Sequence, residues 1–215
     1  MRPPVTVRPS RLQWAELIVV SAVLVWSAIG ALQPPVWVME TLPVWIGGAA
    51  LAWRWRSFPW TGLATALMAL FAIVLCVGGH YTYSLVPLGN SVRDALGLDR
   101  NPYDRLGHLL QGVVPGLLAR ELLLRATPLR PGRATFWIVT SIALAMSATF
   151  ELTEWQTAMI AAPETGLAYL GAQGDVWDAQ WDMACALAGV LLAQLAFARL
   201  HDRQLAELDR RLHGG

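Results

Sequence analysis

Long apolar blocks alternate with short polar segments along most of this chain of 215 residues. Six blocks approach the roughly 20 residues that an α-helix needs to cross the hydrocarbon core of a bilayer. They lie at about residues 14–32, 37–53, 61–79, 106–124, 134–161 and 178–200. The pattern predicts an all-α, polytopic integral membrane protein, with a bundle of six transmembrane helices in one domain that covers residues 1–215.

Turn-forming residues separate the predicted spans. Pro34-Pro35 should turn the chain after the first span, because proline cannot donate a backbone hydrogen bond. A polar stretch at residues 80–105 follows the third span, and a loop with one proline and three glycines, residues 162–174, precedes the sixth. Residues 201–215 form a polar tail, which we expect to be a short amphipathic helix.

The composition supports a membrane protein. Charged residues make up 14% of the chain, whereas a soluble domain carries about 25%. Most of the chain lies in the apolar blocks, which leaves no room for a separate soluble domain, and no segment resembles a nucleic-acid-binding module. Cys76 and Cys185 lie inside apolar blocks and predict no disulfide framework. The sequence does not indicate an oligomeric state.

The arginines predict the orientation in the membrane. With six spans, twelve arginines fall on the side that holds both termini and three fall on the other side. Because cytoplasmic loops carry the excess of basic residues, both termini and the tail are predicted to be cytoplasmic. Near this side, we expect Arg120 to extend its side chain to the interface and Glu121 to pair with an arginine of the tail.

This orientation brings ionisable residues of three spans to the periplasmic side. Asp104 and His108 begin the fourth span, and their spacing of four places them on one helix face. Glu151 and Glu154, three residues apart, share a face of the fifth span. The start of the sixth span adds a stripe of three aspartates, Asp175, Asp178 and Asp182.

The predicted depth of these charges in the membrane requires an explanation. A charged side chain in hydrocarbon costs at least about 2.5 to 3.5 kcal/mol, and carboxylates that converge without a nearby lysine repel one another. A bound cation or protonation would remove this repulsion. Carboxylates with histidine suit Zn²⁺, Mn²⁺, Fe²⁺ or Mg²⁺. We therefore predict a divalent metal ion held by Asp104, His108, Glu151, Glu154, Asp178 and Asp182.

Simpler roles stay open for several of these residues. Asp104, Asp175 and Asp178 could cap the helices that they begin. Arg105 could pair with a carboxylate, and Glu40 is left open. The residues that could support the metal ligands or bind a substrate are His80, Tyr83, Asp175, Arg105, Gln111 and Gln156.

Five runs of residues resemble a bacterial inner-membrane family that includes YjdF, over roughly residues 15–200. The last run is the most specific. The resemblance implies a multi-pass protein of the bacterial inner membrane and points to the same polar residues. The five runs are His80-Tyr81-Thr82-Tyr83, residues 103–108 with Gln111-Gly112, Arg120-Glu121, residues 151–155 and residues 171–183.

A weaker similarity reaches the VanZ-like family, which is associated with glycopeptide-antibiotic resistance. An Asp-x-x-x-His helix start, a membrane glutamate followed by glutamine, and a later aspartate recur there in the same order. This pattern would be filled here by Asp104, His108, Glu154 or Glu151, Gln156 and Asp182. Neither resemblance implies a substrate or a reaction.

The polar residues lead to three functional hypotheses. The first is a metal-dependent hydrolase or transferase that acts on a lipid or lipid-linked cell-envelope substrate, with Glu151 or Glu154 as the catalytic base. The second is an ion- or proton-coupled transporter, which would need acidic residues that continue to the cytoplasmic side. The third is a non-catalytic membrane binding or assembly protein, in which a satisfied polar network holds the helices together.

Overall fold

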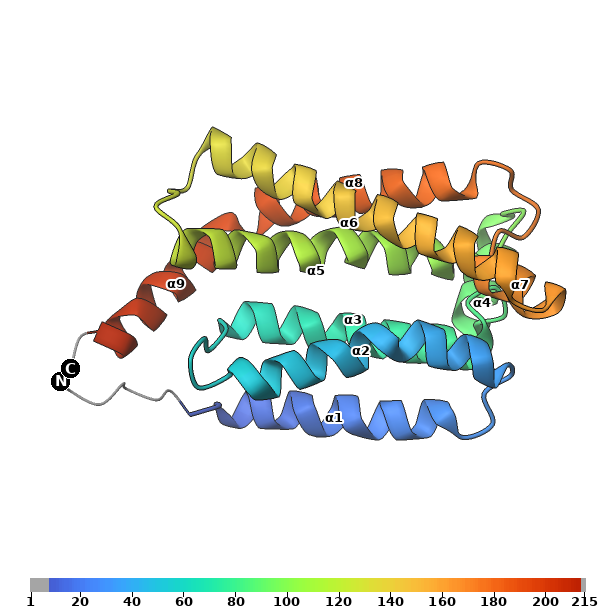
Figure 1. Cartoon of the computed structure of the whole chain (residues 1–215), viewed down its shortest axis with the longest axis horizontal. Coiled ribbons are helices and arrows are strands. Elements are labelled where there is room, and N and C mark those ends of the chain that lie inside the picture. The colour runs from blue at the N-terminus through green and yellow to red at the C-terminus, as the bar shows by residue number, and fades with distance from the viewer. Residues whose placement is uncertain (1–7, 214–215) are drawn as a thin grey trace.

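A computed structural model describes residues 8–213 and shows a helical protein (Figure 1). Six of its helices have 18 residues or more. In chain order the helices are α1 (Arg11–Ala28), α2 (Pro34–Arg54), α3 (Gly62–Tyr81), α4 (Pro87–Leu96), α5 (Tyr103–Ala126), α6 (Arg133–Ile160), α7 (Pro163–Leu170), α8 (Asp178–Ala196) and α9 (Ala198–His213).

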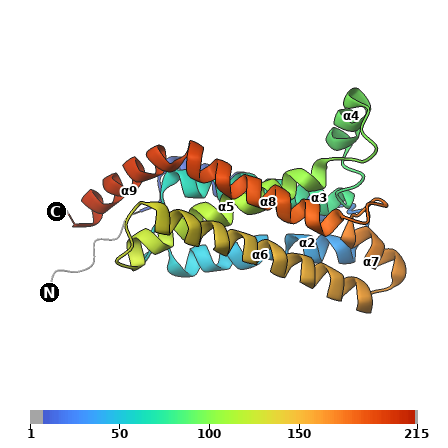
Figure 2. The same ribbon diagram turned by 90° about the horizontal axis from the view of Figure 1, so that it is seen from above.

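The long helices lie side by side, and short helices lie at the two ends of the bundle (Figures 1 and 2). Helices α1, α2 and α3 pack against one another, as do α5, α6 and α8. Contacts between α3 and α5 join these two groups. Helices α4 and α7 lie at one end, called here the α7 end, and α9 lies at the opposite end, the α9 end (Figure 1).

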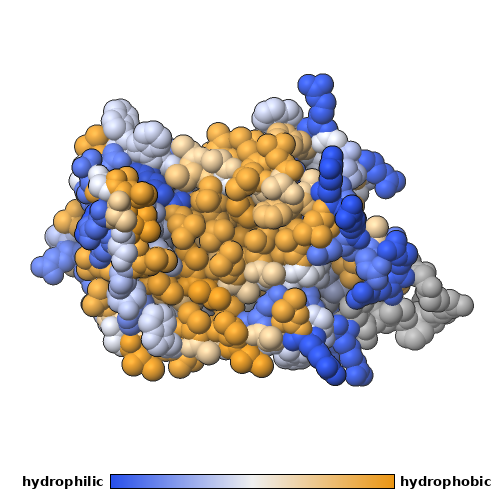
Figure 3. All heavy atoms as spheres, turned by 180° about the vertical axis from the view of Figure 1, so that it is seen from behind, coloured by the Kyte–Doolittle hydropathy of each residue, from blue (hydrophilic) through white to orange (hydrophobic). Residues whose placement is uncertain are grey.

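The face of the bundle seen in Figure 3 is apolar across its middle, with polar residues gathered toward the two ends. Large side chains such as Ile18, Ile46 and Leu195 are exposed on it. A continuous apolar surface of this kind suits contact with lipid chains rather than with water. The protein is therefore an all-α polytopic membrane protein, as the hydrophobic pattern predicts.

The number of spans differs from the prediction. Within residues 8–213, five helices are long and apolar enough to cross a membrane, namely α1, α2, α3, α6 and α8. Helix α5 contains the fourth predicted span but is not among them, so the count of six is not confirmed. The reason is that α5 carries His108, Gln111, Arg120 and Glu121 inside the predicted span, and these polar residues lower its mean hydropathy. The cytoplasmic position of the termini stays a prediction.

Two segments that were expected to form turns contain short helices. Helix α4 lies within residues 80–105, and α7 lies within residues 162–174. A proline in the first turn begins each of them, and a glycine in the left-handed conformation ends each of them, Gly97 and Gly171. Helix α9 forms the expected amphipathic tail and begins three residues earlier than predicted, at Ala198.

Helices α5 and α8 approach each other closely because glycines lie at their contact. A Cβ atom at Gly112 would lie 1.8 Å from the carbonyl oxygen of Ala186, and one at Gly189 would lie 2.0 Å from that of Leu109. Small residues permit such a close approach between membrane helices. The approach fixes the beginning of α5 against the beginning of α8, where the buried acidic residues lie.

Candidate functional site

Buried polar side chains form two clusters, one near each end of α5. The cluster at the α7 end is called here the His108 cluster, and the cluster at the α9 end is the Glu121 cluster. The His108 cluster consists of Arg100, Asp104, Arg105, His108, Glu151, Glu154, Asp175, Asp178 and Asp182. The Glu121 cluster consists of Thr61, Arg120, Glu121, Arg125, His201 and Asp202.

The His108 cluster contains two sets of atoms that could hold a metal ion. One atom from each of Asp104, His108 and Asp182 lies within 4.8 Å of the other two, and the same holds for His108, Glu151 and Glu154. These five residues were among the six predicted ligands. They come from three helices, α5, α6 and α8, so the structure contains the buried Asp/His/Glu cluster that the predicted topology brings together.

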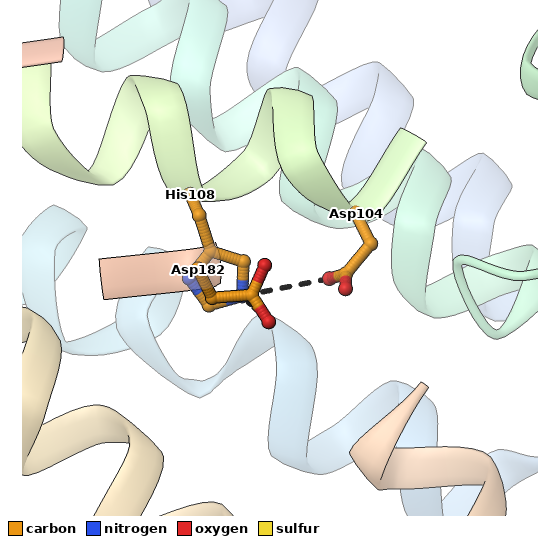
Figure 4. Close-up of side chains that lie close together, drawn as sticks. All are labelled: Asp104, His108 and Asp182. Atoms are coloured by element: carbon orange, nitrogen blue, oxygen red, sulfur yellow. Dashed lines mark ion pairs between the residues drawn. The ribbon is translucent and has the colours of Figure 1, made fainter. Parts of the chain in front are cut away.

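The first set places two aspartates against one nitrogen of the imidazole. His108 Nε2 lies 3.5 Å from Asp104 Oδ1 and 3.9 Å from Asp182 Oδ2 (Figure 4). These separations exceed the roughly 2.7 to 3.2 Å of an N–H···O hydrogen bond. They are close to the separation of about 3.4 Å between ligand atoms of a four-coordinate ion with bonds of about 2.1 Å. The three side chains therefore bring one ligand atom each close enough to the others to share one ion.

Arginines orient both aspartates. Arg100 Nη2 donates to Asp104 Oδ2 at 3.2 Å, and Arg105 Nη1 donates to Asp182 Oδ1 at 2.9 Å. In each carboxylate, the oxygen that faces His108 is the one that does not bind the arginine. Partners of this kind fix the orientation of metal-ligating groups. Arg105 was expected to pair with a carboxylate, whereas the role of Arg100 was not predicted.

The same two arginines hold the other aspartates. Arg100 donates to Asp178 Oδ1, and Arg105 Nη2 donates to Asp178 Oδ1 at 3.1 Å and to Asp175 Oδ2 at 3.0 Å. Burial lowers the pKa of Arg100, but the hydrogen bond and charge of Asp178 raise it above its usual value. Asp178 was predicted as a metal ligand, but the structure places its carboxylate between the arginines and outside both sets.

The other nitrogen of His108 faces the glutamates of α6. His108 Nδ1 lies 3.1 Å from Gln111 Oε1 and 3.5 Å from Glu151 Oε1. A proton on Nδ1 that is donated to Gln111 leaves the lone pair of Nε2 directed at the two aspartates. The Glu151 side chain is only 10% exposed, and its Oε1 has no hydrogen-bond partner among residues 8–213.

A glutamate and two tyrosines complete the surroundings. Glu40 of α2 is 5% exposed. Burial raises the pKa of Tyr83 well above its usual value, and the negative charges of Glu40 and Asp104 raise it further. Burial and the charges of Glu40 and Glu154 likewise raise the pKa of Tyr169. Tyr83 was predicted to lie near the site, Glu40 was left open, and Tyr169 was missed, because α7 was not expected to be a helix.

A clamp between two loops sets the position of the arginines and aspartates. The backbone N–H of Asn101 donates to Gln173 Oε1 at 2.9 Å, and Gln173 Nε2 donates to the carbonyl oxygen of Asn101 at 3.1 Å. Asn101 is fully buried, and its Oδ1 accepts from the N–H of Tyr103 at the start of α5. Asn101 and Gln173 lie next to Arg100 and near Asp175 in the sequence, so this clamp holds the loop before α5 against the loop before α8.

Two predicted residues lie elsewhere. His80 Nδ1 lies 2.9 Å from the carbonyl oxygen of Ser27, and its ring stacks on Trp26 at 4.7 Å between centroids. His80 therefore joins α3 to α1 and is outside the His108 cluster. Gln156 is exposed on α6. Gln156 lies two positions after Glu154 in the sequence, and side chains two positions apart on a helix point in different directions. Its closeness to the glutamates in sequence therefore did not place it on their helix face.

The Glu121 cluster has a different geometry. Glu121 Oε1 accepts from the N–H of Thr61 at 3.1 Å and from Arg125 Nη1 at 2.8 Å. Glu121 Oε2 accepts from Thr61 Oγ1 at 2.7 Å and lies 3.0 Å from His201 Nε2. The expected pairing of Glu121 with an arginine of the tail is therefore wrong: the tail contributes His201, and the arginine comes from α5.

Arg120 is buried rather than extended to the interface. Its Nη2 donates to Asp202 Oδ1 at 2.7 Å, and its Nη1 lies 3.1 Å from His201 Nδ1. An imidazole that accepts from Arg120 on Nδ1 and donates to Glu121 from Nε2 satisfies both ring nitrogens. The cluster thus fastens α9 and the beginning of α3 to α5.

Comparison with known proteins identifies the family. The chain is 44% identical over 200 residues to the inner membrane protein YjdF of Escherichia coli (strain K12), and the match covers 93% of this chain and 95% of that protein. No solved structure matches the chain. Residues 12–203 match the family described as "Predicted membrane protein (DUF2238)". The resemblance to the YjdF-like family is therefore confirmed, and this inner-membrane protein belongs to the DUF2238 family.

Proposed function

We propose that the protein binds a divalent metal ion at Asp104, His108 and Asp182 and uses it to hydrolyse or transfer a group of a lipid or lipid-linked cell-envelope substrate. The observation that carries this proposal is the orientation of the two aspartates. Each binds an arginine through one oxygen and directs the other oxygen toward Nε2 of the same histidine. Zinc, manganese, iron(II) and magnesium all accept carboxylate and imidazole ligands.

We further propose six spans, with both termini in the cytoplasm and the His108 cluster on the periplasmic side. Helix α5 has 24 residues and is therefore about 36 Å long, which exceeds the roughly 30 Å of the hydrocarbon core. Contacts with α3, α6 and α8 surround α5, so that its polar residues are shielded from lipid. The excess of arginines on the side of the termini supports this orientation.

The residues of the site are suited to metal-assisted and acid–base chemistry on a lipid headgroup. A bound divalent ion would polarise a phosphoryl or carbonyl oxygen, or lower the pKa of a bound water. Glu151, whose Oε1 has no hydrogen-bond partner, lies on the other side of His108 and is placed to accept a proton. Glu154 is buried beside it. The position near one membrane face suits a substrate anchored in that leaflet.

The structure favours this proposal over a proton relay across the membrane. A relay needs polar groups at all depths, but buried apolar side chains separate the His108 cluster from the Glu121 cluster along α5. Between Gln111 and Arg120, the buried side chains of α5 are apolar and include Val113, Val114 and Leu117. Gln111 and Arg120 are nine positions apart, which is about 13 Å along the helix axis, so no polar side chain of α5 bridges the two clusters.

The proposal is tested by elemental analysis of the purified protein in detergent. We expect the wild type to retain a divalent ion after extensive dialysis, and Asp182→Asn and His108→Ala to lose it. Glu164→Gln is the matched control, because Glu164 is an exposed glutamate of α7 outside the cluster. A wild-type protein that binds no zinc, manganese, iron or magnesium near neutral pH would falsify the proposal.

A further inference from the structure

The charges on the two sides of His108 differ. On the aspartate side, four aspartates form ion pairs with two arginines, so that one divalent cation would neutralise the remaining charge. On the other side lie Glu40, Glu151 and Glu154, and within residues 8–213 no arginine forms an ion pair with any of them. Buried charges are normally paired or bind a metal. Within the described residues, the only ion pair of these three glutamates is the one between Glu151 and His108, at 3.5 Å, and one imidazole cannot neutralise three carboxylates.

The geometry on this side could hold an ion. Glu151 and Glu154 lie one turn apart on α6, and one carboxylate oxygen of each lies within 4.8 Å of the other and of a nitrogen of His108. Glu151 Oε1 is buried, points toward His108 and accepts no hydrogen bond from any described residue. A buried carboxylate oxygen that is left without a donor is costly, and a cation would remove this cost.

The neighbouring tyrosines do not supply the missing charge. The raised pKa values of Tyr83 and Tyr169 keep both phenols neutral. They can donate hydrogen bonds to carboxylates but cannot neutralise them. Both side chains are buried.

We infer that a second divalent cation binds between Glu151 and Glu154, with Glu40 as a further carboxylate nearby. The inference rests on the proposed function, because the first cation occupies the opposite side of His108. The site would then be a two-cation centre, in which a substrate oxygen can be stabilised by two positive charges rather than by one. A phosphate ester of a lipid, which carries negative charge on two free oxygens, is the chemical class that such a centre suits best.

The number of bound ions tests this inference separately from the proposed function. Protein purified in detergent is equilibrated with Mn²⁺, freed of unbound ion and analysed for manganese. We expect about two ions per chain in the wild type and in the control Glu164→Gln, and about one each in Glu154→Gln and in Asp182→Asn. Glu151→Gln provides a second variant of the same site if Glu154→Gln does not elute as a monodisperse protein.

The outcomes separate the two sites. About one ion in the wild type that is lost in Asp182→Asn and kept in both Glu154→Gln and Glu151→Gln overturns the second site and leaves the first site standing. A loss of one ion from the glutamate variants, with the other ion kept, supports the second site. A wild type without manganese overturns both sites.

Discussion

The two polar clusters at the ends of α5 contain similar residues but satisfy them differently. In the Glu121 cluster, both oxygens of Glu121 have two partners each, and all four contacts are between 2.7 and 3.1 Å. In the His108 cluster, the imidazole lies 3.5 to 3.9 Å from three carboxylates, and Glu151 Oε1 has no hydrogen-bond partner in the part of the chain that the structure describes. Both clusters are buried, so burial alone does not distinguish them.

The difference indicates which cluster is structural. A buried network in which every group is paired contributes rigidity and holds helices in place. A buried cluster with unpaired oxygens is unfavourable by itself, and its contacts become favourable when a ligand binds. We therefore assign a structural role to the Glu121 cluster and a binding role to the His108 cluster. The comparison leads to three predictions.

The largest expected effect is the loss of stability in Glu121→Gln. This substitution leaves Arg125 and His201 without the carboxylate that both contact. Removing one partner of a buried ionic network costs about 3 to 5 kcal/mol, so we expect the free energy of unfolding in detergent to fall by about 3 kcal/mol or more. Thermal or denaturant unfolding of the purified protein measures this change. A decrease no larger than that of Glu164→Gln contradicts a structural role for the Glu121 cluster.

A smaller effect is expected from metal binding. A ligand at about 100 times its dissociation constant stabilises the folded protein by about 2.7 kcal/mol. We expect divalent metal to stabilise the wild type by an amount of this order, and to have no such effect on His108→Ala. Glu121→Gln provides the matched comparison, since it should lose stability and still respond to metal. Equal stabilisation of the wild type and His108→Ala would place the bound ion elsewhere.

The smallest effect is expected for Glu151→Gln in the metal-free protein. Because the carboxylate of Glu151 has an unpaired buried oxygen, replacing it by a neutral amide removes a charge that has no cationic partner other than His108. We expect the free energy of unfolding to change by less than about 1 kcal/mol or to rise. Chelator-treated protein should be used for this measurement. A loss as large as that in Glu121→Gln would show that the two clusters do not differ in the proposed way.

Hydrophobic periodicity predicted the all-α membrane fold because long apolar blocks have few alternatives to membrane helices. It was less informative for α5. Neighbouring helices shield the polar residues of α5 from lipid, and the sequence of α5 alone does not reveal this shielding. The gathering of acidic residues at one end followed from helical spacing and from the alternation of span direction. Asp104 and Asp182 could be brought to the same end in this way, but their contacts with His108 depend on the close approach of α5 and α8.

The residues that the sequence did not predict have contacts that no local pattern encodes. Arg100 lies in the loop before α5, and only the folded chain shows that it reaches Asp178 and Asp104. Glu40 is an isolated glutamate on a different helix. His201 was predicted to begin a polar, amphipathic tail, but its side chain is fully buried against Glu121. Contacts between residues 80 positions apart require the packing of α9 against the bundle.

The central claim is that Asp104, His108 and Asp182 hold a divalent ion, and anomalous X-ray scattering locates such an ion most directly. Crystals grown with Zn²⁺ or Mn²⁺ should show an anomalous peak within bonding distance of His108 Nε2, Asp104 Oδ1 and Asp182 Oδ2, while Arg100 and Arg105 keep the other carboxylate oxygens. A peak elsewhere, or no peak between these three atoms at saturating metal, would contradict the account.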